Sequence, residues 1–167
     1  KIGNIEFVGT KKFNTESLLE RINTRTGDKF EGTKTTSKII ADLLLANIFE
    51  KKINVFVKKH EDCVDLRIVL VEKKLLSEYT IEGNKHVPFS VLSNITKLKD
   101  VKYFSDHDVK VFVEQIVRKY NQINMFGTKV EAILEDDPDY KDGVKLSFKI
   151  TEGSKCKISD VKLNGCN

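Results

Sequence analysis

The stretch IGNIEFVG at residues 2–9 recurs as LSEYTIEG at residues 76–83 and as ISDVKLNG at residues 158–165. In each copy apolar residues alternate with other residues before a glycine, which is the pattern of a half-buried strand that ends in a turn. The copies begin 74 and then 82 residues apart. The repeat therefore predicts two complete modules, residues 1–74 and 75–154, followed by the first strand of a third module at residues 155–167.

Two helices are predicted after each of the first two copies of this strand. Asn14 can cap a first helix, and Pro88 stands where the corresponding helix of the second module begins. A second helix is predicted to start near residues 33–36, and its counterpart starts after Ser105, with Asp108 three residues further on. That counterpart carries one apolar face at helical spacing, formed by Val109, Phe112, Val113, Ile116, Val117 and Tyr120.

A hairpin of alternating strands is predicted to close each module. The first hairpin turns at residues 59–62, and the second turns through the acidic loop at residues 136–143. Apolar residues on one face of these strands and polar residues on the other indicate a sheet that is covered by helices on one side only. The fold class is therefore α+β, with the element order β-α-α-β-β in each module.

Catalytic and metal-binding patterns find little support. The three histidines, His60, His86 and His107, stand apart from any nucleophile motif, and no glycine-rich phosphate loop occurs. The acidic loop at residues 136–143 does not follow the ligand spacing of a calcium-binding loop. The three cysteines cannot all pair with one another, so no disulfide framework is expected. We expect no enzymatic activity, no cofactor and no metal.

The charge pattern argues against a nucleic-acid partner, and the short apolar runs argue against a membrane-spanning helix. The net charge is +4, but lysines alternate with acidic residues instead of gathering on one face. A β-α-α-β order can also mark a KH-type RNA-binding domain, but the segments between the helices, residues 25–30 and 97–104, lack the GxxG loop that such a domain needs. The apolar runs are far shorter than the roughly 20 residues that span a bilayer.

The repeated β-α-α-β-β module resembles the POTRA domain of the Omp85 family of outer-membrane proteins. Local motifs support the resemblance: RTGD at 25–28, NIFE at 47–50, VEK at 71–73, IEGNK at 81–85 and ITEG at 150–153. Together they look like the first two POTRA modules of a BamA-like assembly factor. The sequence departs from the repeat at MFG, residues 125–127, which replaces NIF of residues 47–49, and in segment 97–103, which has no Thr-Gly-Asp turn.

The resemblance implies a fold, a location and partners. It implies a three-stranded mixed sheet packed on two helices, in the periplasmic part of an outer-membrane protein that carries a C-terminal membrane β-barrel. The implied partners are unfolded outer-membrane protein precursors and accessory assembly lipoproteins. They would bind by β-augmentation, in which an extended segment adds a strand to an open sheet edge. The edges carried over are Ile53, Asn54, Val55, Phe56 and Val57, and Lys129, Val130, Glu131, Ala132, Ile133 and Leu134.

Three further expectations concern details of this assignment. The aromatic ring of Phe56 is expected to point outward from its edge strand, although burial against a neighbouring loop is equally compatible with the sequence. Lys73, Lys74 and Leu75 are expected to form a short hinge that permits limited bending. Within the same fold, the alternative identities are a two-partner secretion transporter, a TamA-like factor or a cell-division protein. The repeated modules disfavour the division protein, and the expected third module also disfavours the two-partner transporter.

Overall fold

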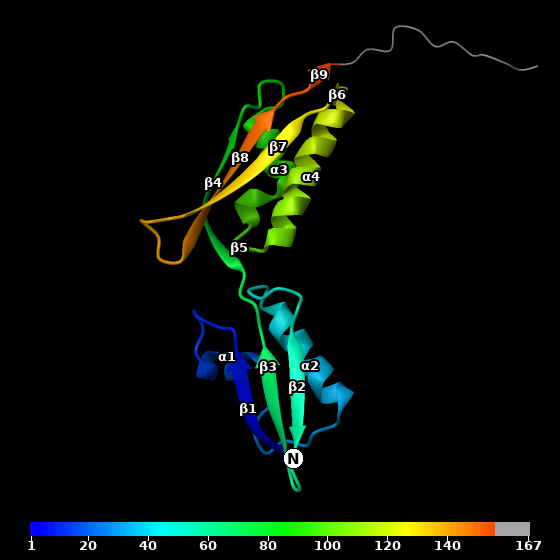
Figure 1. The fold of residues 1–167 in the computed structure, drawn as a ribbon, viewed down its shortest axis with the longest axis vertical. Coiled ribbons are helices and arrows are strands. Elements are labelled where there is room, and N and C mark those ends of the chain that lie inside the picture. Colours follow the sequence, from blue (N-terminus) through cyan, green and yellow to red (C-terminus); the bar gives the residue numbers. More distant parts are fainter. Residues whose placement is uncertain (156–167) are drawn as a thin grey trace, which may run out of the picture. The chain divides into compact units, whose positions relative to one another are not determined.

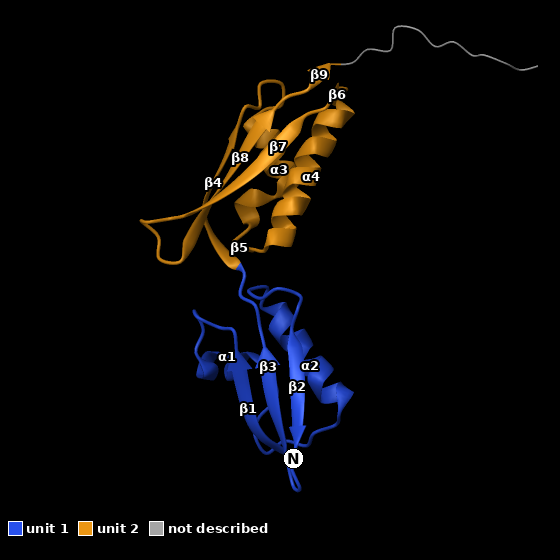
Figure 2. Ribbon diagram, viewed as in Figure 1, with its two compact units in different colours: residues 1–73 blue, residues 74–167 orange. Residues whose placement is uncertain are grey.

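The computed structural model describes residues 1–155, so the predicted first strand of a third module lies almost entirely outside the described residues. The chain forms two compact units, the first comprising Lys1–Lys73 and the second starting at Lys74 (Figure 2). Within the described residues, no helix has the length and apolar character needed to cross a membrane.

The first unit has the predicted element order. Strand β1 (Ile2–Val8) is followed by helices α1 (Thr15–Arg21) and α2 (Thr33–Leu45) and by the hairpin β2 (Asn54–Lys59) and β3 (Val64–Val69). The strands lie in the order β1-β3-β2, with β1 parallel and β2 antiparallel to β3. Both helices lie on the same side of this sheet (Figure 1). The prediction of an α+β module with a three-stranded mixed sheet is confirmed.

The second unit repeats this plan with additions. Its main elements are β4 (Lys74–Glu82), α3 (Phe89–Thr96), α4 (Asp106–Gln122), β7 (Lys129–Asp136) and β8 (Gly143–Thr151). The short elements η1 (Leu98–Asp100), β5 (Tyr103–Phe104), β6 (Met125–Phe126) and β9 (Ser154–Lys155) were not predicted from the sequence. The sheet order is β5-β4-β8-β7, so β5 adds a short fourth strand to the expected three.

The helices begin where their capping residues predict. The Asn14 side chain accepts a hydrogen bond of 2.8 Å from the Ser17 amide at the start of α1. Ser105 and Asp108 form a reciprocal capping box at the start of α4. Such caps satisfy amides that have no partner within the helix, and each stabilises it by about 0.5–2 kcal/mol. Pro88 is the N-cap of α3, one position before the first helical turn.

Each unit has its own core between the sheet and the helices. In the second unit α4 contacts β7, and the most buried members of its predicted face, Ile116 and Tyr120, belong to one core with Leu146 and Phe148 of β8. Each fully buried aliphatic or aromatic side chain of this kind contributes about 1.5–3 kcal/mol of hydrophobic free energy. Two separate cores allow each sheet to present its own edge.

Candidate binding edges

Strand β2 forms one open edge of the first unit's sheet. The His60 amide donates to the Cys63 carbonyl oxygen at 2.8 Å. This bond shows which facing residues of the β2–β3 hairpin form hydrogen-bonded pairs. Bonded pairs alternate along an antiparallel ladder, so Asn54, Phe56 and Lys58 bond to β3. The backbone groups of Val55, Val57 and Lys59 therefore point outward. Three N–H and three C=O groups are thus directed toward an added strand.

Ile53 does not belong to this edge. It lies before β2, which begins at Asn54, and its side chain is only 7% exposed. Its apolar character reproduces the alternation of Val55 and Val57, which is why the sequence pattern placed it within the strand. The edge instead extends to Lys59, which the sequence assigned to the turn.

Strand β7 forms the corresponding edge of the second unit. The Asp137 amide donates to the Gly143 carbonyl oxygen at 2.9 Å, and the same alternation then runs along the whole β7–β8 ladder. The backbone groups of Val130, Ala132, Leu134 and Asp136 consequently point outward. The predicted edge residues Lys129 to Leu134 all lie in this strand.

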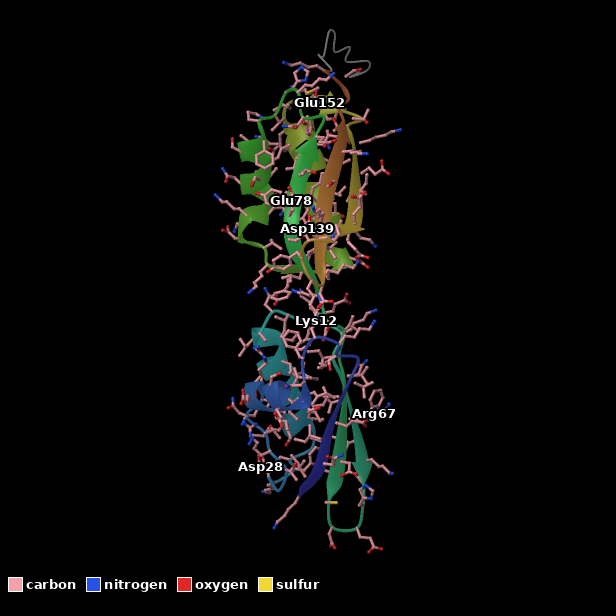
Figure 3. The ribbon with its side chains drawn as sticks, turned by 90° about the vertical axis from the view of Figure 1, so that its left-hand side faces the viewer. Lys12, Asp28, Arg67, Glu78, Asp139 and Glu152 are labelled. Atoms are coloured by element: carbon pink, nitrogen blue, oxygen red, sulfur yellow. The ribbon has the colours of Figure 1, made fainter. Side chains whose placement is uncertain are left out.

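Strand β2 carries one exposed apolar side chain, Phe56, on the solvent face of the sheet. Phe56 is 58% exposed, as the outward assignment predicted. It lies across from Arg67 on β3, which in turn lies across from Glu6 on β1, and the Arg67 guanidinium is 3.5 Å from the Glu6 carboxylate. These side chains line a shallow hollow of about 350 Å³. Figure 3 shows Arg67 on the side of the sheet away from the helices.

The far edge of each sheet is partly closed at its beginning. In the first unit the Ile2 amide donates to Asp28 and the Gly27 amide donates to the Ile2 carbonyl, so the RTGD turn covers the start of β1. In the second unit β5 pairs with the start of β4. Segment 97–103 lacks the Thr-Gly-Asp motif but leads into the same kind of closure. The departure noted in the sequence therefore preserves the architecture.

A glutamate after the last strand ties each unit together. Glu72 accepts hydrogen bonds from the Lys11 and Lys12 amides at 2.8 and 3.0 Å. Glu152 accepts from the amide and ring of His86 at 2.8 and 2.6 Å and from the Tyr120 hydroxyl at 2.9 Å. We call these two residues the closing glutamates. The sequence motifs that end each module contain them, but nothing in the sequence indicated their partners.

The environment of Glu152 favours its charged form. Burial by itself raises the pKa of its carboxyl, but the hydrogen bonds from His86 and Tyr120 outweigh that effect and hold the pKa below its ordinary value. For Tyr120, burial and then the Glu152 carboxylate raise the phenol pKa above its usual range. The pair is therefore a carboxylate bonded to a neutral phenol at physiological pH. Figure 3 shows Glu152 at the end of the second unit where β8 finishes.

The segment after the second helix pairs with the chain as it leaves each unit. In the first unit the Lys73 amide donates to Ile48 at 2.9 Å, and in the second unit β6 pairs with β9. Asn47 and Asn124 precede these pairings with φ of 53° and 62°. The equivalent of NIF at 47–49 is therefore residues 124–126, and the comparison with residues 125–127 was wrong by one residue. The shared left-handed asparagine two positions beyond the helix gives the correct alignment.

The predicted hinge residues are bonded within one unit or the other. Lys73 pairs with Ile48 in the first unit. Lys74 and Leu75 belong to β4 and pair with Phe104 and Tyr103 in the second unit. The backbone pairing of the first unit therefore extends to Lys73, and that of the second unit begins at Lys74.

The histidines are separate from one another. His60 lies 2.9 Å from the Asp65 carboxylate in the β2–β3 turn, His86 bonds to Glu152, and His107 lies exposed in the first turn of α4. Among residues 1–155 no group of three or more histidine, cysteine, aspartate or glutamate residues is arranged to hold a metal ion.

These observations define a class: tandem small α+β modules, each with an open antiparallel edge strand. The family model described as surface antigen variable number repeat, or POTRA, matches residues 1–73 and 75–153. The chain belongs to the POTRA family, and the resemblance seen in its sequence is confirmed.

Several solved structures are similar to this chain at low sequence identity. The chain is 16% identical to Haemophilus influenzae BamA POTRA3-5, with a TM-score of 0.49. The match covers 100% of this chain and 72% of the BamA fragment. The chain is also 16% identical to the N-terminal domain of Omp85 from Thermosynechococcus elongatus, with a TM-score of 0.45, covering 89% of this chain and 61% of that one. Escherichia coli CdiB is 14% identical, with a TM-score of 0.39, covering 89% and 26%. No curated protein sequence matches the chain.

Proposed function

We propose that this chain is a periplasmic POTRA segment of an Omp85-family, BamA-like outer-membrane assembly factor. It would bind unfolded outer-membrane protein precursors and accessory assembly lipoproteins, and it would act by binding and not by catalysis. The whole protein would carry a C-terminal membrane β-barrel. Family membership supports the class of protein, and the open edges support the mode of binding.

The single observation that carries the proposal is the outward row of backbone groups on β2 and on β7. An incoming extended chain can pair with these N–H and C=O groups whatever its side chains are, because the bonds are made by the main chain. Such binding tolerates many sequences, as a receptor for many different precursors requires. The exposed Phe56 of β2 adds an apolar contact for alternate side chains of the ligand.

An amide NMR titration with peptides copied from outer-membrane barrel strands tests this proposal. We expect shifts concentrated on β2 or β7. Val57→Pro removes one outward donor without breaking the β2–β3 ladder, because the Val57 amide does not bond to β3. It should weaken binding at β2, whereas Val57→Ala keeps the donor and serves as the matched control. Shifts confined to the helices, or equal loss in both variants, would contradict pairing at β2.

The same titration can separate assembly from secretion. Peptides from the exported partner of a two-partner secretion system form a second panel beside the barrel-strand peptides. A clear preference for the secretion panel would favour the transporter alternative over the assembly factor.

We also propose that the join at Lys73, Lys74 and Leu75 bends only within narrow limits. The bonds of Lys73 and of Lys74–Leu75 lie on the two sides of one peptide bond, which leaves few backbone torsions to absorb a change of direction. Solution scattering tests this: a narrow distribution of overall dimensions is expected. A broad distribution typical of independently tumbling units would contradict it.

A further inference from the structure

The flanks of the β2 edge are strongly basic. Lys51 and Lys52 lie one residue before the strand, separated from it by Ile53, and Lys58 and Lys59 end it. All four are exposed, and residues 51–59 contain no acidic residue. Within the described part of the chain, these lysines form no ion pair. Their charge is therefore available to a ligand that lies along the strand.

The acidic residues near β2 do not cancel this charge locally. Asp65 lies across from Lys58 in the ladder, but its carboxylate is 2.9 Å from the His60 ring. Glu61 and Asp62 lie beyond the end of the strand, in the turn that leads to β3. A chain paired with Val55 and Val57 would thus have lysines near both of its ends.

The β7 edge has the opposite character. The strand itself holds Glu131, Glu135 and Asp136 against a single lysine, Lys129. Lys145 on β8 lies opposite Glu135 but is shared with Glu78 at 3.4 Å and Asp137 at 3.6 Å. Lys149 on β8 faces Glu131 and offsets part of the negative charge. The edge as a whole remains acidic.

We propose that the two edges select extended segments by opposite charge, β2 taking segments flanked by acidic residues and β7 taking segments flanked by basic residues. This inference rests on the proposed function, because it assumes that the edges pair with peptides. Backbone pairing would supply affinity at both edges, and the charges would decide which segment each edge prefers. A precursor with both kinds of flank could then engage both units through different parts of its length.

The size of the effect follows from the exposure of the charges. Exposed ion pairs each change affinity modestly, so two flanking charges at each end should change the dissociation constant by about threefold to tenfold at low ionic strength. The preference should disappear near 1 M salt, where the screening length falls to about 3 Å. The pairing itself should persist there, since its bonds are between main-chain groups.

Two synthetic peptides and the full chain test the proposal. Both peptides share an alternating valine–threonine core, and they differ only in carrying glutamate pairs or lysine pairs at the two ends. Amide shifts of Val55 and Val57 report on β2, and those of Val130 and Ala132 report on β7. We expect the glutamate peptide to bind β2 more tightly and the lysine peptide to bind β7 more tightly.

Charge reversal supplies the decisive comparison. The double variant Lys58→Glu, Lys59→Glu leaves Lys51 and Lys52 to balance the two new carboxylates, so it should abolish the preference at β2 and leave β7 unchanged. The control Lys99→Glu, Lys110→Glu changes net charge equally at exposed positions outside both edges and should alter neither. Equal binding of both peptides at both edges would overturn the charge selectivity while leaving edge pairing intact. Absence of shifts at either edge with every peptide would overturn the proposed function as well.

Discussion

Substitution of Gly83 by alanine tests how closely the strands of the second unit must approach. Gly83 follows β4 with a φ of +82°, and a Cβ atom there would lie 2.0 Å from the carbonyl oxygen of Ile150. Gly127 has a similar φ of +78° but nothing within 4 Å of its Cβ position. Gly127→Ala therefore carries the cost of the left-handed backbone alone, whereas Gly83→Ala carries that cost and the collision.

The difference between the two variants isolates the close approach. Alanine in the left-handed region costs about 1–2 kcal/mol, part of which is offset by the lower entropy of the unfolded chain. These contributions are common to both positions. Relieving the collision at Gly83 requires the end of β4 to move away from β8, and forced overpacking of this kind costs about 1–3 kcal/mol more. We therefore expect Gly83→Ala to be less stable than Gly127→Ala by about 2 kcal/mol.

Urea unfolding followed by amide NMR measures this difference, because resolved signals report on each unit separately. The first unit offers an independent repetition: a Cβ at Gly9 would lie 2.2 Å from the Leu70 carbonyl oxygen, whereas Gly27 has open space. Gly9→Ala should thus lose about 2 kcal/mol more unfolding free energy than Gly27→Ala. Equal stability within either pair would refute the argument that the repeated glycine is required by close packing.

Three further predictions concern single side chains. Glu152→Gln should lower the stability of the second unit by about 1–2 kcal/mol at neutral pH. The folded pKa of Glu152 lies below its ordinary 4.5, so the stabilisation by the Glu152 carboxylate is complete above pH 4.5 and is lost as the pH falls through the folded pKa. The unfolding curves of the variant and the parent should therefore converge in acid. Ser105→Ala should cost about 1 kcal/mol in urea unfolding, since it removes the capping box of α4, and an unchanged midpoint would contradict that role. Phe56→Ser should leave thermal unfolding within about 0.5 kcal/mol of the parent, since the ring is exposed, yet weaken peptide binding at β2 in the same NMR titration, and unchanged binding would remove Phe56 from the proposed site.

Local sequence patterns predicted most of the fold, but they did not predict the hydrogen bonds between segments that are distant in the sequence. The capping residues Asn14 and Ser105 mark helix starts because the cap is made within a few residues along the chain. The two-residue strands β5 and β6 are too short for any alternation to be visible. They are specified by pairing with segments about 30 residues away in the sequence, which no local pattern records.

The candidate edges show the same division. The family resemblance predicted which strand of each hairpin lies at a sheet edge. The alternation of residues in the first hairpin predicted that Phe56 faces outward. Alternation also placed Ile53 in the strand, because a buried residue just before a strand has the same apolar character as one inside it. The partners of Glu152 come from α4 and from the loop after β4, so only the folded chain brings them together.

The closing glutamates have a consequence for how such a chain can change in length. Glu72 bonds to the loop after β1, and Glu152 bonds to the loop after β4, so each unit completes its own network before the chain passes on. A gene duplication that copies one such segment would deliver a unit already equipped with every partner that it needs. Arrays of different length could therefore arise by copying alone, with mutation left free to diversify the charges along each edge.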